Sequence, residues 1–196
     1  MKILVATTNP GKLREIEQIL AGPSIHLVAL SEVPPGPEPE ETGNTFAENA
    51  RLKALYYAAA TGLPSVADDS GLEIDALGKA PGVHSARWHG TDYAVKFRRI
   101  YEGLAERGVS RSPARFVAAV ALADGDRILF ETEGVVEGEI APEPRGSGGF
   151  GYDPIFFYPP LGCTLAEVTG EAKAAVSHRG AAFRGLREYL LGSTPK

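Results

Sequence analysis

Ala67-Asp68-Asp69-Ser70-Gly71 places two adjacent carboxylates between two apolar segments of the chain. Residues 63–67 are short and apolar, and residues 72–77 alternate with the period of a half-buried strand. We therefore expect a strand on each side and the two acids at the turn between them. Adjacent carboxylates repel, and Mg²⁺ is commonly held by one or two carboxylates together with substrate phosphates. The pair indicates a magnesium site; the alternative is a solvated turn, since Asp, Ser and Gly all favour turns.

Length and composition are those of an ordinary globular protein. The 196 residues suit one domain, with room for two lobes, and hydrophobic and charged residues make up 43% and 23% of the chain. A formal net charge of -5 argues against a nonspecific nucleic-acid binder, which needs a basic surface. The single cysteine, Cys163, excludes an intramolecular disulfide and a cysteine cluster for zinc. Because the first apolar run, residues 3–6, is too short for a signal peptide or a membrane span, we expect a cytoplasmic protein with no membrane partner.

The N-terminal residues have the pattern of a strand, a loop and a helix. Residues 3–6 form the expected strand, and Thr7-Thr8-Asn9-Pro10-Gly11-Lys12 follows it. Apolar residues then recur with helical spacing at Leu13, Ile16, Ile19 and Leu20. Asn9 suits the helix cap, and Pro10 suits the first helical position. Free backbone N–H groups at this helix start, together with Lys12, indicate a phosphate cradle; the alternative is a well-capped helix with an exposed lysine.

A surface loop rich in Pro, Gly and Glu is expected over residues 32–44. Its acids are typical of a solvated face. Alternatively, Glu40 or Glu41 gives the metal another carboxylate, and the sequence does not distinguish these two neighbours.

A capping-box pattern at residues 45–48 predicts a helix that runs to about Gly62. Asn49 and Lys53 are four residues apart on it and therefore share a face. Lys53 either points inward toward acids or is a surface lysine whose stem lies along apolar neighbours.

The middle of the chain predicts one more helix and a hairpin. A helix is expected from Thr91 or Asp92, and apolar residues recur along it at Phe97, Ile100, Tyr101 and Leu104. Two β-rich segments, residues 114–123 and 127–140, are joined by Asp124-Gly125, which is a strong hairpin signal. The sheet is therefore expected to be mixed.

Glycines and aromatic residues alternate at Gly146-Ser147-Gly148-Gly149-Phe150-Gly151-Tyr152-Asp153-Pro154. Such glycines let backbone approach a ligand, and the aromatic rings can stack on a base. The alternative is a tight turn whose aromatic residues belong to the core. An ordered loop before a buried strand at residues 155–158 is expected in either case.

Cationic or titratable groups gather before the last amphipathic helix, at Lys173, His178 and Arg179, with Ser177 among them. The dipole at a helix start disfavours cations, so their presence indicates an anionic or acceptor-rich partner.

Six segments of the chain resemble the inosine triphosphate pyrophosphatase family. They are Thr7–Lys12, Glu41–Ala50, Ala67–Gly71, Pro81–Arg87, Gly148–Pro154 and Ser177–Arg179. Each segment is weakly specific alone, but the six occur in the family's order and span nearly the whole chain.

The resemblance implies a fold and an activity. The fold would be a two-lobed α/β domain spanning residues 1–196, with a long mixed central sheet flanked by helices and the active site in the cleft between the lobes. The activity would be hydrolysis of non-standard purine nucleoside triphosphates (ITP, dITP and XTP) to the monophosphate and pyrophosphate with Mg²⁺, cleansing the nucleotide pool. A homodimer is also implied.

The resemblance also implies residue roles by position. Asp69 would be the general base and a metal ligand, with Asp68 and Glu40 or Glu41 supporting the metal. The residues implied to bind phosphates are Thr7, Thr8, Asn9, Pro10, Gly11, Lys12, Lys53 and Ser70. The residues implied to form the nucleoside side are Phe150, Gly151, Tyr152, Asp153, Lys173, His178 and Arg179.

Base choice has a chemical basis in the 6-position of the purine. Inosine and xanthosine have an acceptor oxygen there, whereas adenosine has an amino donor. Arg179 carries only donors and is therefore a candidate for reading that edge, beside His178 and the backbone N–H groups of residues 150–152.

Two other classes of protein remain open. One is a nucleotide-sensing module without turnover, and the other is a phosphatase that removes only the terminal phosphate. A pyrophosphate-release assay on ITP separates all three.

Overall fold

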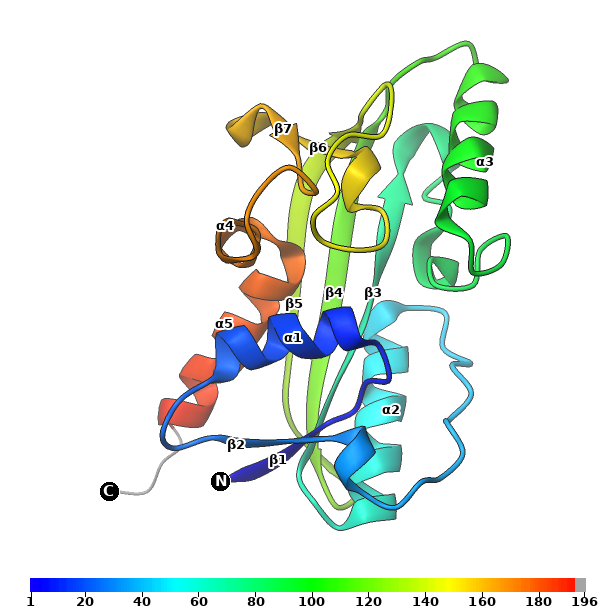
Figure 1. Cartoon of the computed structure of the whole chain (residues 1–196). Coiled ribbons are helices and arrows are strands. Elements are labelled where there is room, and N and C mark those ends of the chain that lie inside the picture. Colours follow the sequence, from blue (N-terminus) through cyan, green and yellow to red (C-terminus); the bar gives the residue numbers. More distant parts are fainter. Residues whose placement is uncertain (193–196) are drawn as a thin grey trace. The chain divides into compact units, whose positions relative to one another are not determined.

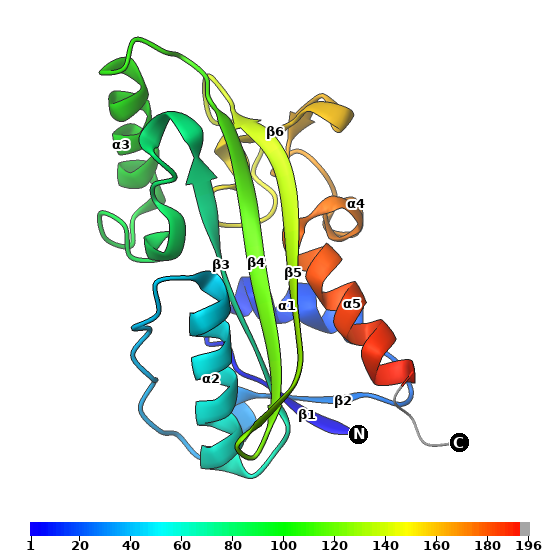
Figure 2. The same ribbon diagram turned by 180° about the vertical axis from the view of Figure 1, so that it is seen from behind.

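The computed structural model describes residues 1–192 and shows an α/β fold with a seven-stranded sheet (Figures 1 and 2). The strands are β1 (Lys2–Val5), β2 (His26–Ala29), β3 (Ser65–Ile74), β4 (Pro113–Asp124), β5 (Arg127–Ile140), β6 (Phe156–Tyr158) and β7 (Cys163–Thr164). The helices are α1 (Pro10–Leu20), α2 (Phe46–Thr61), α3 (Tyr93–Ala105), α4 (Gly170–Val176) and α5 (His178–Gly192).

The sheet has the strand order β2-β1-β3-β4-β5-β6-β7. β1 pairs in parallel with β2 and β3, whereas β6 pairs antiparallel with β5 and β7. The predicted mixed sheet flanked by helices is therefore confirmed. Strands β3, β4 and β5 are long enough to contribute residues to two compact units.

Unit 1 comprises residues 1–69, residues 118–134 and the chain from His178, and unit 2 comprises residues 70–117 and 135–177. The single domain over residues 1–196 stays an expectation, and its last four residues lie outside the described part of the chain. The position of the active site in a cleft likewise stays a prediction.

Unit 1 has its own core. In both views α1 and α5 lie beside each other on one face of its strands, and α2 lies on the other face (Figures 1 and 2). Buried apolar side chains of the strands and of helices α1 and α5 form this core, among them Ile3, Val5, Ile16, Leu20, Val66, Val120, Phe183 and Leu186. Helix α2 is capped as predicted by Thr45, whose side chain accepts from the backbone N–H of Glu48, and ends at Gly62.

Unit 2 has a second core, formed by α3, by the parts of β3, β4 and β5 that belong to residues 70–117 and 135–177, and by the segment around β6. Its buried residues include Leu72, Ile74, Ile100, Leu104, Phe116, Ile140, Tyr152 and Phe156. α3 begins after the cap Asp92, as predicted. Its buried face carries Lys96 in line with Ile100 and Leu104, four residues apart.

The prediction of a turn at Asp68 and Asp69 is wrong. β3 runs unbroken through both residues, and the two residues are only 2% and 6% exposed. Successive side chains of a strand point to opposite faces, so the two carboxylates separate without a turn. The solvated-turn alternative is excluded by the same burial.

Two other boundaries differ slightly from the prediction. The hairpin loop is Gly125–Asp126, one residue later than expected, because Gly125 takes the first loop position with a φ of 57°. Lys173 lies in a separate helix, α4, and Ser177 caps its end, while His178 and Arg179 are the first residues of α5.

Candidate active site

The start of α1 is capped by Asn9, as predicted. Its Oδ1 accepts from the backbone N–H groups of Gly11 (2.8 Å) and Lys12 (3.2 Å), and Pro10 takes the first position. The expectation of free N–H groups at these positions is therefore wrong, because the cap uses them. Any phosphate binding here rests on the side chain of Lys12 and on the preceding loop residues Thr7 and Thr8.

Lys12 is not an exposed lysine. Its Nζ lies 3.0 Å from Oδ2 of the buried Asp68, and its side chain is only 16% exposed. Lys12 therefore extends from the helix start to strand β3, so the alternative of a surface lysine is wrong.

Asp68 receives a second cation from α5. Nε and Nη2 of Arg179 both lie 3.2 Å from the same Oδ2 of Asp68, and Nη1 of Arg179 lies 2.6 Å from Oε2 of Glu15. Arg179 is almost completely buried. The anionic partner expected for this helix start is thus within the protein itself, although the base-reading role of Arg179 stays a prediction.

The environment of Asp68 favours its ionised form. Burial opposes ionisation, but Lys12 and Arg179, and more distantly Lys53, hold the pKa of Asp68 well below its usual range. Its second oxygen, Oδ1, is buried and has no hydrogen-bond partner among the described residues. A buried carboxylate oxygen in this state favours a ligand or cation.

Asp69 faces α2 on the opposite side of β3. Nδ2 of Asn49 donates to Oδ2 of Asp69 (3.0 Å), while Oδ1 of Asn49 accepts from the backbone N–H of Gly43 (2.8 Å). Asn49 is fully buried. It therefore both orients Asp69 and holds the end of the loop that carries Glu41.

Lys53 joins the same group of residues. Its Nζ donates to Oε1 of Glu41 (2.8 Å) and to the backbone carbonyl of Asp68 (2.7 Å), and lies 3.8 Å from Oδ1 of Asp69. Lys53 thus points inward, and the surface alternative is wrong. Glu41 is brought beside Asp69 through this lysine, whereas Glu40 is exposed. The geometry favours Glu41 of the two neighbours.

The pKa of Asp69 moves in the opposite direction from that of Asp68. Burial raises the pKa of Asp69, and the negative charge of Glu41 adds to this effect, while Lys53, Lys12 and the hydrogen bond from Asn49 oppose it. One acid of the pair is strongly ionised and the other is a better proton acceptor, the separation that acid–base chemistry requires.

The residues predicted for the nucleoside side that lie in unit 2 also form a connected group. Lys173 donates to Oδ2 of the buried Asp153, and the same oxygen accepts from the backbone N–H of Phe150 (2.8 Å). Nζ of Lys173 lies 4.6 Å from the centre of the Phe150 ring. Gly149 has a φ of 66°, and a Cβ there would lie 2.1 Å from Oδ2 of Asp153, so glycine is required.

The two aromatic residues of this loop differ. Phe150 is half-exposed, consistent with stacking on a ligand, whereas Tyr152 is buried in the core of unit 2. The core alternative therefore holds for Tyr152. Gly151 is half-buried between them with a φ of 68°, and Ser70 is half-buried within β3.

His178 and Arg179 depend on a close approach between α5 and β5. Gly134 of β5 leaves no room for a side chain, because a Cβ there would lie 2.1 Å from the backbone oxygen of His178. Gly134 is not among the predicted site residues, and nothing in its local sequence distinguishes it from the other glycines. Glu15 was not predicted either, although the three-residue spacing from Lys12 places both on one face of α1.

We predict that Gly134→Ala destabilises the protein by about 1–3 kcal/mol, because the nearest atoms are backbone that can move only by shifting α5. Urea unfolding measures the change. Gly185→Ala in α5 is the control. Its Cβ would lie 3.7 Å from Oγ1 of Thr132, an ordinary contact distance, and alanine is favoured over glycine within a helix. Equal stability of the two variants would contradict the close approach.

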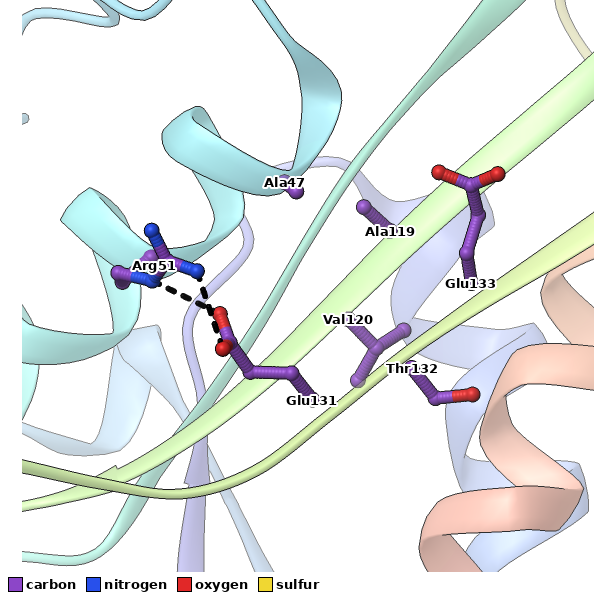
Figure 3. A pocket seen from close by; sticks show the side chains of 7 residues that line it. All are labelled: Ala47, Arg51, Ala119, Val120, Glu131, Thr132 and Glu133. Carbon is purple, nitrogen blue, oxygen red and sulfur yellow. Dashed lines mark hydrogen bonds and ion pairs between the residues drawn. The ribbon is translucent and has the colours of Figure 1, made fainter.

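A hollow of about 200 Å³ lies elsewhere in unit 1, between α2 and strands β4 and β5 (Figure 3). Arg51 and Glu131 form an ion pair at its edge, with Nε and Oε1 2.8 Å apart. No predicted site residue lines it. The active-site candidates therefore remain the groups around Asp69 and Asp153.

The fold and the site together define a class: an α/β protein with buried lysines and carboxylates on both faces of one central strand. A family model described as the Ham1 family matches residues 3–189, and the chain belongs to this family. This confirms the resemblance found in the sequence. No helix in residues 1–192 is long and apolar enough to cross a membrane.

Relatives match over nearly the whole chain. A protein of Thermus thermophilus named dITP/XTP pyrophosphatase is 49% identical and aligns over 100% of this chain and 95% of its own length. A Gloeobacter violaceus protein of the same name is 50% identical, covering 94% and 91%. The solved structure of a HAM1 protein from Coxiella burnetii has a TM-score of 0.89 and 42% identity, covering 98% of this chain and 100% of that one.

Proposed function

We propose that this protein hydrolyses non-standard purine nucleoside triphosphates (ITP, dITP and XTP) to the nucleoside monophosphate and pyrophosphate. The proposal rests on one observation: Asp68 and Asp69 lie on opposite faces of β3, and each carboxylate is held by its own cations and hydrogen-bond donors. The relatives named dITP/XTP pyrophosphatase, similar over nearly their whole length, support the substrate class.

In this proposal Asp69 is the general base. Its raised pKa makes it a better proton acceptor than an ordinary aspartate, and it accepts the proton of the attacking water on a carboxylate oxygen. Asn49 fixes the orientation of that carboxylate through its own link to Gly43. Lys12 and Lys53 are already held at the acids, so they can transfer hydrogen bonds to phosphate oxygens without reorganising.

The proposed cofactor is Mg²⁺. Among the described residues no three His, Cys, Asp or Glu side chains form a ready metal cluster. Magnesium requires fewer protein ligands, because it keeps waters and shares substrate phosphates. Asp69 and Glu41, which both lie within 4 Å of Nζ of Lys53, supply suitable oxygens, and Oδ1 of Asp68 is a further buried oxygen on the opposite face of β3. When bound, the ion would increase the acidity of a coordinated water and offset phosphate charge.

The remaining roles complete the proposal. The loop before α1 and Ser70 would contact phosphates, and the group around Phe150, Asp153 and Lys173 would hold the nucleoside. A homodimer and a cytoplasmic location are also proposed, without a partner nucleic acid or membrane.

The test is product analysis with purified protein and Mg²⁺. ITP, dITP and XTP should each yield pyrophosphate and the monophosphate, with ATP and GTP much poorer substrates. Orthophosphate as the product would favour the terminal phosphatase, and binding without turnover would favour the sensing module.

A second prediction concerns the protonation of the two acids in the metal-free protein. The Asp69 carboxyl should titrate above the ordinary aspartate value of about 3.9, because burial raises its pKa, and the Asp68 carboxyl well below it. Carbon NMR of the side-chain carboxyls measures both, with Asp69→Asn to assign the higher titration. Adding Mg²⁺ should lower the pKa of Asp69. Indistinguishable titrations of the two acids would contradict their separate environments.

A further inference from the structure

Among the lysines of residues 1–192 that have no role assigned above, Lys96 is the most deeply buried. Its exposed fraction is 0%, and it occupies a core position of α3, on the same face as Ile100 and Leu104. Nζ of Lys96 donates to the backbone carbonyls of Ser85 (3.0 Å) and Ala86 (2.7 Å). No carboxylate of the described residues forms an ion pair with it.

A buried ammonium without a carboxylate is unfavourable unless other groups compensate. Here the compensation comes from the two carbonyls and from aromatic faces, since Nζ lies 4.4 Å from the ring centre of Tyr93 and 5.7 Å from that of Tyr152. An apolar side chain would fill the same space without the cost of desolvation. The charge therefore serves the two carbonyls and not the packing of α3.

The carbonyl of Ser85 is shared with the predicted nucleoside segment. The hydroxyl of Tyr152 donates to the same oxygen (2.9 Å), and the Tyr152 ring packs edge to face on Tyr93 with centres 5.2 Å apart. Ser85 is held from its other end, because its Oγ accepts from the backbone N–H of Leu72 (2.9 Å) and donates to the carbonyl of Gly82 (2.6 Å).

Tyr152 transmits this anchoring to its neighbours in sequence. It directly precedes Asp153, whose Oδ2 holds both the backbone N–H of Phe150 and Nζ of Lys173. The shape of the Phe150–Asp153 segment is therefore fixed at two points, by Lys173 through Asp153 and by Lys96 through Ser85 and Tyr152.

We propose that Lys96 is a positioning residue for nucleoside recognition, which holds Tyr152 and thereby the Phe150–Asp153 segment in the conformation that binds the purine nucleoside. This inference rests on the proposed function, since it assigns that segment to the nucleoside. It adds a residue on α3 that does not itself touch the substrate.

The test is calorimetry, which measures the affinities of the protein for the two proposed products, IMP and pyrophosphate, in separate titrations. It therefore does not depend on turnover. In Lys96→Met the affinity for IMP should fall by about tenfold or more, as expected for a lost buried hydrogen bond to a charged group, while the affinity for pyrophosphate stays within about twofold. Lys96→Arg keeps the charge and should recover part of the IMP affinity. Lys79→Met, an exposed lysine of the same unit, is the control and should change neither.

A second variant keeps the proposal testable if Lys96→Met does not fold. Tyr152→Phe removes only the hydroxyl on the Ser85 carbonyl and should weaken IMP binding selectively. In the double variant the losses should be less than additive, because both side chains act on one oxygen. Equal weakening of IMP and pyrophosphate, or unchanged IMP binding in both single variants, would overturn the proposal. Absence of turnover in the wild type, with IMP and pyrophosphate still bound, would overturn the proposed function alone.

Discussion

Replacing Asp69 with Asn is expected to lower kcat for ITP by about a hundredfold or more, as for the loss of a general base or a metal ligand. The amide keeps the shape of the carboxylate and its contact distance to Asn49 but cannot accept the proton of water. Steady-state pyrophosphate release at saturating Mg²⁺ measures the effect. A variant that retained half of the wild-type rate would remove Asp69 from the mechanism.

The fold should survive this substitution, and the raised pKa of Asp69 predicts the direction of the change in stability. A carboxyl whose pKa is higher in the folded than in the unfolded state stabilises the protein below the unfolded pKa, and this contribution is lost as the pH rises through the folded value. At neutral pH the ionised Asp69 therefore opposes folding. Asp69→Asn should unfold in urea at the same or a higher concentration than the wild type.

A matched pair of variants separates the neighbouring acids. Glu41→Gln should reduce turnover and weaken the dependence of the rate on Mg²⁺, because the carboxylates of Glu41 and Asp69 both lie within 4 Å of Nζ of Lys53. Glu40→Gln should leave both unchanged, because Glu40 is exposed. The reverse pattern would assign the metal to Glu40.

Replacing Arg179 with Met should have the largest effect on stability, about 3–5 kcal/mol, because it leaves the buried carboxylate of Asp68 without one of its cations. Oδ2 of Asp68 would lose both of its contacts with the guanidinium, and Glu15 would lose a hydrogen bond of 2.6 Å. Urea unfolding measures this change. Arg14→Met, an exposed arginine of α1, should alter stability by less than about 0.5 kcal/mol.

The kinetics of Arg179→Met distinguish two roles for Arg179. Either it stabilises the carboxylate of Asp68, or it recognises the purine base. The contacts of Arg179 favour support of Asp68, so efficiency should fall by a similar factor for ITP, XTP, ATP and GTP. A much larger loss for ITP and XTP would instead assign the 6-position of the base to Arg179. In the double variant with Asp68→Asn, the stability losses should be less than additive, because the two residues form one pair.

The sequence determined the local structure of this protein. Asn9 and Pro10 define the start of α1, the Thr45 capping box and Gly62 define α2, and apolar or alternating runs predict β1, β4, β5 and β6, because these signals act between residues close in the chain. The short strands β2 and β7, the separate helix α4 and the continuity of β3 were not predicted. Six short segments in order were also enough to assign the family, which the family model confirms.

Only the tertiary structure decided how the acids and cations of the candidate site pair. Asp68 and Asp69 are adjacent in the chain and were expected to share one turn, but the alternation of β3 sends them to different helices. Lys96 occupies a position where helical periodicity predicts an apolar residue, and its stabilising carbonyls come from Ser85 and Ala86, eleven and ten residues earlier. Charged groups acquire their partners through space, so the periodicity of a single segment cannot supply this information.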